Sequence, residues 1–365
     1  MKKFAAIGIV VTFLFFSFIA CGHKVGAPAA GSAKAEDMLS MFPKEARGLL
    51  VVDVHRAMQT EPAQKMIADK DSAPKYQEFI KETGIDPQKD VYFVAGALIG
   101  DMNQAKPDGA LIINARYNKD TLLAKVKEKG GELKESVYEG ITVYEIKEPA
   151  KSPAMEKEEG KAQEKSEGQE PAAKEAQESQ PETMQAASAP AYGAFLSDSN
   201  IVFGSEAGVK AVIDVLKNKK ENVFKNPELS DLIKQSKKDA MVWAVVAIPA
   251  EAAKKMAQQN PMLSSLEGIH SVLFSFDYRN KAIEAELKAL NKDEQKNKQI
   301  ADLLTGLKAM GGMASSEKPE VGELMNKIIV SSGPDFVSVS ASIPEELINK
   351  LSESAKKVIP EMEKK

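Results

Sequence analysis

Two apolar runs on either side of Arg279-Asn280 constrain the fold of this chain more than any other feature. Asparagine tolerates a positive φ, so this dipeptide predicts a two-residue hairpin turn. The predicted pairs are Phe276 with Ile283, Phe274 with Ala285, Val272 with Leu287, Ser275 with Glu284 and Leu273 with Glu286. One face of the hairpin is then apolar and the other mostly polar. This pattern predicts an antiparallel sheet with helices on one face and water on the other.

Strand and helix patterns follow one another in an order that occurs twice along the chain. The first part contains predicted strands at 48–54, 91–99, 110–115, 137–146, 192–196 and 201–203, with helices ending at Gly84 and covering 119–129 and 209–216. The second part contains a strand at 241–248, a helix from Ala250, the hairpin, a helical section at 293–329, a strand at 336–342 and a helix at 345–358. We therefore predict an α+β fold of two related subdomains, each an antiparallel sheet with helices packed on one face. The predicted domains are residues 38–236 and 237–360, and their origin by duplication stays open.

An acidic segment interrupts the first predicted domain. Residues 149–190 contain nine Glu and five Lys but no Ile, Leu, Val, Phe, Tyr or Trp. Such a composition cannot bury enough apolar surface to offset the entropy lost on ordering, which predicts disorder. Strand-like runs at 141–146 and 192–196 flank the segment, so we interpret it as an insertion in a hairpin loop. It is either a solvated spacer or an arm that binds the cell wall or a partner.

The N-terminus has the pattern of a lipoprotein signal peptide. Two lysines precede an apolar stretch at 4–18, which is shorter than the roughly 20 residues of a transmembrane helix. The sequence Phe-Ile-Ala-Cys at 18–21 resembles a bacterial lipobox. Cys21 is the only cysteine, so internal disulfides and cysteine-based metal centres are excluded. We predict that residues 1–20 are removed and that Cys21 is acylated, with palmitate among its acyl groups.

Acylation at Cys21 places the mature chain on a membrane of the cell envelope. Gly22 follows the cysteine, and the resemblance to Gram-negative lipoproteins then favours the outer membrane, facing the periplasm. Residues 21–37 are rich in Gly, Ala, Ser and Lys, which predicts a flexible tether. An envelope protein is the expected partner at this location.

The charge balance excludes two classes of binding protein. Without the signal peptide the chain has 47 basic and 53 acidic residues, a net charge of −6. Proteins that bind nucleic acid or an anionic membrane surface through charge carry clustered Lys and Arg. No such cluster occurs here, so nucleic acid is excluded as a partner.

Three stretches together resemble a family of bacterial exported proteins known only as a domain of unknown function. They are Phe42-Pro43 leading into 48–54, the segment 82–90 before a strand, and 140–144 continued after the acidic insertion by 191–196, 200–205 and 207–216. The likeness covers most of residues 41–216. It implies an exported protein of this fold, but its motifs are structural and it carries no functional residues with it.

Few residues form a recognisable catalytic pattern. Asp53 and His55 lie two apart at a strand end, so they could share one face as an acid–base pair. No nucleophile elbow accompanies them, and we interpret the pair as a polar strand terminus. Gly204-Ser205-Glu206 is interpreted as a strand exit whose serine caps the next helix.

Metal and cofactor signatures are also missing from the sequence. Glu82, Asp86 and Asp90 lack the spacing and the glycine of a calcium loop. Only His55 and His270 fall within the predicted domains, too few for an imidazole-rich zinc site. We therefore expect no metal and no cofactor.

Methionines around the glycine pair at 311–312 suggest an adaptable surface. Met310, Met313 and Met325 could line a hydrophobic groove for a lipid or peptide, although methionine at helical spacing is usually core. Trp243, within an apolar strand, is expected in the core. Our leading hypothesis is a non-enzymatic structural or partner-binding module of the envelope. The alternatives are a carrier of an apolar ligand in the methionine groove and an enzyme with a noncontiguous site.

Overall fold

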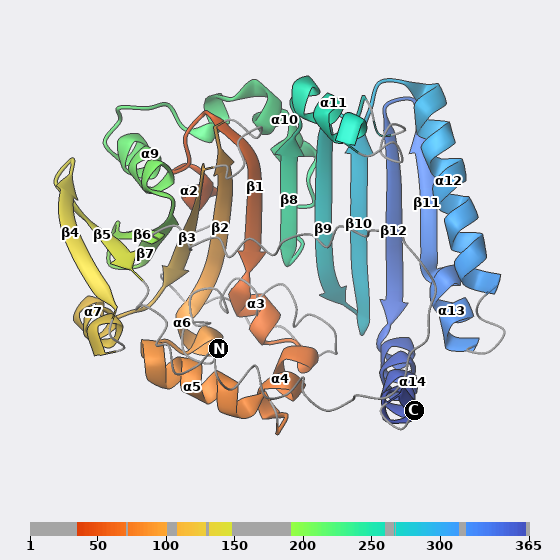
Figure 1. Cartoon of the computed structure of the whole chain (residues 1–365), viewed down its shortest axis with the longest axis horizontal. Helices are drawn as coiled ribbons and strands as arrows, with labels where there is room; N and C mark the ends of the chain where they lie inside the picture. The colour runs from red at the N-terminus through yellow and green to blue at the C-terminus, as the bar shows by residue number, and fades with distance from the viewer. Residues whose placement is uncertain are drawn as a thin grey trace, which may run out of the picture.

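The computed structural model describes residues 35–70, 72–100, 108–128, 131–147, 191–259, 266, 268–313 and 319–362. Helices and antiparallel strands are mixed along the chain, which confirms the predicted α+β class (Figure 1). The signal peptide, Cys21, most of the tether and the acidic insertion lie outside the described residues.

The elements follow one another in this order: α2 (Ala35–Leu39), β1 (Ala46–Asp53), α3 (Val54–Met58), α4 (Glu61–Ala68), α5 (Ala73–Thr83), α6 (Pro87–Asp90), β2 (Val91–Ile99), β3 (Asp108–Ala115), α7 (Lys119–Glu128), β4 (Glu132–Tyr138), β5 (Ile141–Lys147), β6 (Ala191–Phe195), β7 (Asn200–Gly204), α9 (Glu206–Leu216), η2 (Val223–Lys225), α10 (Pro227–Gln235), β8 (Val242–Ala247), α11 (Ala250–Gln259), β9 (Ser271–Arg279), β10 (Ala282–Leu290), α12 (Glu294–Met313), α13 (Pro319–Lys327), β11 (Ile328–Gly333), β12 (Phe336–Pro344) and α14 (Glu345–Met362).

All twelve strands belong to one sheet, in the order β11-β12-β10-β9-β8-β1-β2-β3-β7-β6-β5-β4. This corrects the expectation of a separate sheet in each half. The halves join because β1 pairs antiparallel with β8, from Gly48 opposite Val246 to Val52 opposite Val242. On each side of this junction the sheet continues with a hairpin, β2–β3 in the first half and β9–β10 in the second. The next strand outward, β7 or β12, is in each case the last strand of its half in sequence order. The two halves therefore share one order of elements.

Helices pack on both faces of the sheet, which corrects the expectation of helices on one face only. Helices α2, α9 and α10 cover one face, which we call the helix-covered face. Their buried side chains, among them Met38, Val212 and Leu229, pack with Val51 and Trp243 in one continuous core. Trp243 is 1% exposed, so its predicted core position is confirmed.

Other helices frame the opposite face of the sheet. At one end, α3 and α5 contribute Val54, Ala57 and Tyr76 to a cluster with Val52 and Val242 of the sheet. Beside β11 and β12, Ile300 and Leu304 of α12 pack in a separate cluster with Val337 of β12. The centre of this second face, between the two clusters, is the part that the helices leave least covered (Figure 1).

The predicted hairpin forms, but its register differs by two residues. The turn is Asn280-Lys281, with φ of +51° and +61°, and Arg279 pairs with Ala282. A tight turn of this type needs positive φ at both central residues, so Asn280 takes its first position rather than its second. Phe276 therefore faces Ala285, and Phe274 faces Leu287. A shift of two residues keeps every side chain on its predicted face.

Local signals of the sequence are confirmed in several places. Gly84 ends α5 in the left-handed conformation, with φ of +70°. Ser205 caps α9, its hydroxyl accepting from the Gly208 amide at 3.0 Å. Strands β5 and β6 pair with each other, so the acidic segment is inserted between hairpin partners.

Two boundaries differ from the prediction. Helix α2 begins at Ala35, inside the predicted tether, because Met38 and Leu39 are fully buried and anchor it. Strand β11 was missed: the predicted helical section at 293–329 covers its first two residues, and residues 330–333 had no predicted element. Its run Ile-Ile-Val-Ser-Ser-Gly directly follows α13, and pairing with β12 decides its conformation.

Candidate functional site: a partly exposed apolar face

Burial along β9 is the reverse of what its sequence predicts. Ser271, Ser275 and Asp277 lie on the helix-covered face and are buried, at 1%, 8% and 5% exposure. Phe274 and Phe276 lie on the opposite face and are only partly buried. The prediction that helices cover the apolar face of this hairpin is therefore wrong for its centre. Trp243 and Leu273 extend the core onto the Ser/Asp side, because β8 and β9 continue the sheet of the first half.

Apolar side chains on this face, together with the buried Gly96, form one row that crosses eight strands in register. We call this set the apolar row: Leu111, Gly96, Leu50, Ala244, Phe274, Leu287, Val339 and Val330, from β3 to β11. Strands are spaced by about 4.8 Å, so the row is about 34 Å long. No member carries a charge or a hydrogen-bonding side chain. The row is therefore a long apolar strip on the sheet surface.

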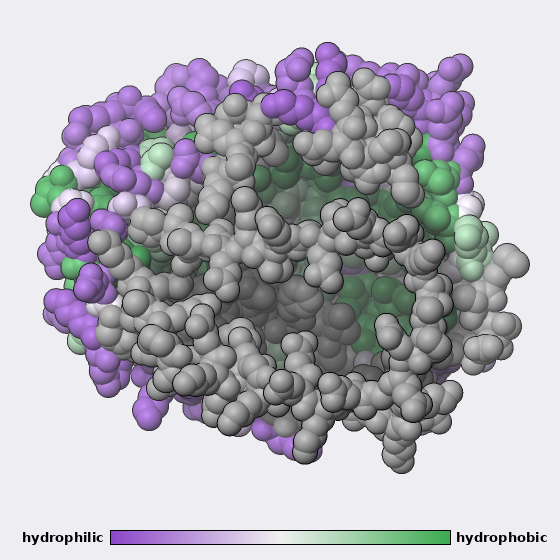
Figure 2. Space-filling model, in the orientation of Figure 1, coloured by the Kyte–Doolittle hydropathy of each residue, from purple (hydrophilic) through white to green (hydrophobic). Residues whose placement is uncertain are grey.

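Exposure of large side chains marks where the strip is open. Leu287 at the centre of the second half is 50% exposed, and Leu98, in the neighbouring row on β2, is 38% exposed. Hydrophobic side chains are visible deep within this face in Figure 2, framed by hydrophilic surface at the top and left of the view. Water-exposed leucines at the centre of a sheet face are unfavourable by about 25 cal/mol per Å² of apolar surface. An apolar partner would remove that cost.

At the edge of this face, polar side chains connect the first half of the chain with the second. Glu345, the first residue of α14, pairs with Lys65 of α4 at 3.1 Å and accepts a hydrogen bond from Tyr278 at 3.2 Å. Hydrogen bonds to Glu61 and then to Glu345 raise the pKa of Lys65. These polar residues therefore hold α4 and α14 beside the end of β9, next to the apolar row.

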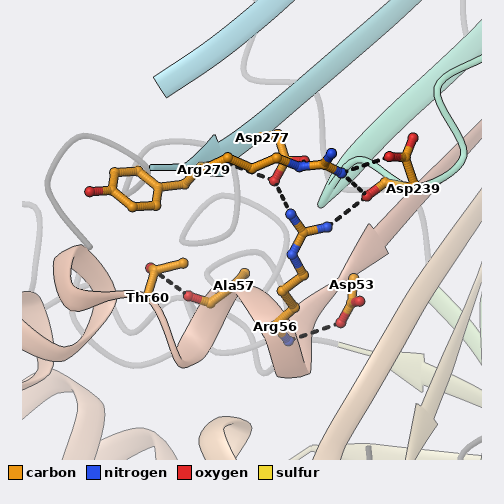
Figure 3. A network of polar contacts seen from close by, with 8 residues as sticks. Asp53, Arg56, Ala57, Thr60, Asp239, Asp277 and Arg279 are labelled. Carbon is orange, nitrogen blue, oxygen red and sulfur yellow. Dashed lines mark hydrogen bonds and ion pairs between the residues drawn. The ribbon is translucent and has the colours of Figure 1, made fainter. Parts of the chain in front are cut away.

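A buried ion-pair network ties α3 to the hairpin at the same end of the sheet (Figure 3). The Asp277 side chain is 6% exposed and pairs with Arg56 at 2.5 Å and with Arg279. Both guanidinium groups also donate to the Asp239 carbonyl, at 2.6 and 2.7 Å. Arg56 comes from the first half and the other three residues from the second. The network therefore fixes the position of α3 relative to β9.

Asp53 and His55 do not form an acid–base pair. The Asp53 carboxylate accepts from the Arg56 amide at 2.9 Å and so caps α3. Burial raises the pKa of Asp53. The His55 ring contacts Gln59 at 2.6 Å and lies near Tyr92, while its Nδ1 is buried without a hydrogen-bond partner. These contacts match the interpretation as a polar strand terminus.

The carboxylates at 82–90 are engaged in local structure. Asp86 caps α6 and accepts from Tyr76, and Asp90 accepts from the Asp86 amide and from Arg116. Lys89 and other donors lower the pKa of Asp86 against the effect of burial. Within the described residues, no group of three or more His, Cys, Asp or Glu could hold a metal ion.

The three methionines predicted to line a groove are placed differently from one another. Met310 lies on the outer flank of α12 and is 68% exposed. Met325 of α13 packs against Gly311, where its sulfur would lie 3.1 Å from an added Cβ. The side chain of Met313 lies outside the described residues. Of the three, Met325 packs in the α12–α13 contact and Met310 is exposed. The apolar row, whose members alternate along β8, β9 and β10, was the surface that sequence reasoning missed.

A pocket of about 610 Å³ opens where β9 begins and α12 begins, lined by His270, Asn291, Lys292 and Glu294 among others. Asn291 is 2% exposed and its Nδ2 has no hydrogen-bond partner. Lysine and glutamate side chains line the same pocket, so it favours neither an anion nor a cation.

Comparisons with known proteins found few similarities. No family model matches the chain, and no curated protein matches it. Crystal form I of TP0453 is 12% identical, covers 89% of this chain and 98% of its own, and has a TM-score of 0.43. Crystal form III of the same protein is 11% identical, covers 86% and 97%, and has a TM-score of 0.43. At these scores the likeness bears on neither fold nor function. Among the described helices, none has the length and apolarity to cross a membrane.

Proposed function

We propose that this protein is a lipid-anchored component of the bacterial envelope that binds the acyl chain of a lipid along the apolar row, without catalysing a reaction. The observation that carries the proposal is the reversed burial of β9, where phenylalanines are more exposed than serines and an aspartate. A sequence that keeps large apolar side chains at a partly open sheet centre is typical of a binding surface. The resemblance to an exported family of unknown function stays a prediction.

The shape and chemistry of the row favour an acyl chain over a polar ligand. One leaflet of a bilayer accounts for about half of a hydrocarbon core roughly 30 Å thick, so a chain of about 15 Å fits within the row. The rows on either side, such as the one containing Val246 and Val272, are also uncharged. Each buried methylene of the ligand contributes about 0.8 kcal/mol. An apolar-ligand carrier is therefore better supported than a purely structural module.

The sequence pattern around Cys21 supports the proposed location at a membrane of the cell envelope. An acylated N-terminus holds the protein at an envelope membrane, where lipids are the abundant apolar ligands. An outer-membrane position facing the periplasm follows from Gly22 if the cell is Gram-negative. The partners we propose are thus the membrane, through the lipid on Cys21, and a lipid bound on the sheet.

Replacing Leu287 with glutamine is expected to weaken binding of a fluorescent fatty acid, cis-parinaric acid, at least about tenfold. The ligand loses contact with a leucine side chain, and it must also dehydrate an amide that has no partner in the row. Titration of the full chain by fluorescence measures this change. Ala244→Phe, which fills the strip between Leu50 and Phe274, is expected to reduce binding as well.

Leu216→Gln is the matched control for Leu287→Gln. Leu216 is 37% exposed but lies at the end of α9, on the helix-covered face. Its replacement should leave the affinity unchanged. A wild-type protein that binds no fatty acid, or equal losses in both variants, would overturn the proposal.

Cys21→Ser is expected to abolish incorporation of radiolabelled palmitate into the protein. Serine lacks the thiol that accepts the diacylglyceryl group, so the chain is neither acylated nor processed. The control Ser32→Ala, in the same N-terminal segment, should retain the label. Labelling of the Cys21→Ser chain would contradict the lipid anchor while leaving ligand binding on the sheet to be judged by the Leu287 experiment.

A further inference from the structure

Helix α12 lies lengthwise along the edge strand β11. Near the start of the helix, the Asn297 side chain donates to the carbonyls of Gly333 and Pro334, at the end of β11, at 3.0 and 3.3 Å. Eleven residues later, Lys308 donates to the carbonyl of Ile328, the first residue of β11, at 2.6 Å. Eleven steps along a helix and five steps along a strand both span about 16.5 Å. The helix therefore runs antiparallel to β11, along the direction of the strands.

Two leucines of α12, Leu303 and Leu307, form what we call the leucine flank. Successive residues of a helix are about 100° apart around its axis. Ile300 and Leu304, which pack on the sheet, lie on average about 50° around the helix from the two residues that contact β11. The leucine flank lies about 60° further in the same direction, and its side chains are 51% and 55% exposed. Hydrophobic surface is visible there on the right of Figure 2. The flank therefore points away from β11, toward the space above the apolar row.

The apolar row and the leucine flank run in different directions. The row crosses the strands, and it reaches α12 at Val339 of β12 and Val330 of β11. The flank follows the axis of α12, which is parallel to the strands. Leu287 in the row is 50% exposed, about as much as the leucines of the flank. One extended acyl chain can cover the row or the flank, but it cannot follow both.

We propose that the lipid bound on this face has two acyl chains, one along the apolar row and the other along the leucine flank of α12. The inference rests on the proposed function and names the class of lipid, a diacyl glycerolipid. Two chains that leave one glycerol can separate where the row reaches α12. They also lose translational freedom once, whereas two single-chain lipids lose it twice. Each buried methylene of the second chain strengthens binding about fourfold.

A membrane is a poorer match for the leucine flank. An amphipathic helix binds a bilayer by burying its apolar side in the headgroup region, which requires that side to be the outermost surface of the protein. The flank is turned toward the apolar sheet instead. A ligand held between them contacts both surfaces, and a bilayer reaches only one.

Calorimetric titration with two phosphatidylcholines tests for the second chain. The full chain carrying Cys21→Ser is titrated with diheptanoylphosphatidylcholine and with heptanoyl-lysophosphatidylcholine, which has the same headgroup and a single acyl chain. The two-chain lipid is expected to bind at least about a hundredfold more tightly. Leu307→Gln should weaken binding of the two-chain lipid at least about tenfold and so narrow this ratio, because the second chain then meets an amide. Leu287→Gln should weaken binding of both lipids, because both use the row.

Ile329→Gln is the matched control for Leu307→Gln. Ile329 is 59% exposed on the neighbouring strand β11, but it lies on the opposite face of the sheet from Val330 and the row. Its replacement should leave both affinities unchanged. An equal loss of affinity in Ile329→Gln, or a ratio that Leu307→Gln leaves unchanged, would overturn the inference.

The outcomes separate this inference from the proposed function. If cis-parinaric acid and the single-chain lipid bind but the two-chain lipid binds no more tightly, the second chain is wrong and binding along the row stands. If none of the three ligands binds, the proposed function and this inference are both overturned. Flotation with phosphatidylcholine vesicles that is lost on Leu307→Gln, at an unchanged ratio of affinities, would assign the flank to a bilayer and overturn the inference. Thermal unfolding shows whether each variant is folded.

Discussion

Replacing Asp277 with alanine is expected to lower the free energy of unfolding by about 3 kcal/mol, because a buried ion pair is costly to break from one side. The Asp277 side chain is 6% exposed and pairs with Arg56 and Arg279, whose side chains are 22% and 39% exposed. Without the carboxylate, two guanidinium groups lie close together, near the exposed Asp239 and, for Arg56, the Asp53 carboxylate that caps α3. The partial exposure of both arginines keeps the cost near the lower end of the range for buried pairs. Urea denaturation followed by circular dichroism measures the loss.

Asp239→Ala is the matched control for the same network. Asp239 is 75% exposed, and both arginines donate to its backbone carbonyl, which alanine retains. Its replacement should cost less than about 1 kcal/mol. If Asp277→Ala unfolds at the same urea concentration as the wild type, the network does not hold α3 against β9.

Replacing Gly208 with alanine is the second substitution with a large expected effect. It should lower the free energy of unfolding, the opposite of what alanine normally does in a helix. Alanine within a helix is normally favoured over glycine by about 1 kcal/mol. At Gly208, however, an added Cβ would lie 2.2 Å from the Gly109 carbonyl oxygen, a backbone atom of β3. Helix α9 must then move away from the sheet, and its cap at Ser205, which also accepts from the Gly109 amide, moves with it. We expect a loss of about 3 kcal/mol in unfolding free energy.

Gly306→Ala provides the control for Gly208→Ala. Gly306 lies within α12, and an added Cβ there meets no atom within 4 Å. This substitution should stabilise the protein by up to about 1 kcal/mol, because it only lowers the entropy of the unfolded chain. Opposite shifts in thermal midpoint for the two variants are expected. A stabilised Gly208→Ala protein would show that α9 packs less closely than the structure describes.

Much of the fold could be predicted because the signals that specify it are local. Alternation identified β9 and β10, Gly84 marked the end of α5, and Ser205 was correctly interpreted as the cap of α9. The turn residue Asn280 was found, but its position in the turn depends on the backbone conformation of Lys281, which sequence does not indicate. Strand β11 was missed because pairing with β12 outweighs its position directly after a helix.

The candidate site could not be predicted in the same way. Alternation shows that the two faces of a strand differ, but it does not show which neighbours cover each face. The methionines at 310–325 were singled out because they lie close together in the sequence. The apolar row, in contrast, is assembled from strands up to about 290 positions apart, from Leu50 to Val339. Each member looks like an ordinary core residue in its own strand.

The sequence by itself determined the α+β class, the hairpins, the helix ends and the strands on either side of residues 149–190. The lipid anchor at Cys21 stays a prediction. Only the tertiary structure decided that β1 meets β8, that both halves share one sheet, and that the phenylalanine side of β9 stays partly open. The physical reason is the distance along the chain over which each kind of interaction acts. Turns, caps and alternation act between residues close in the chain, whereas the covering of a sheet face depends on which distant helices reach it.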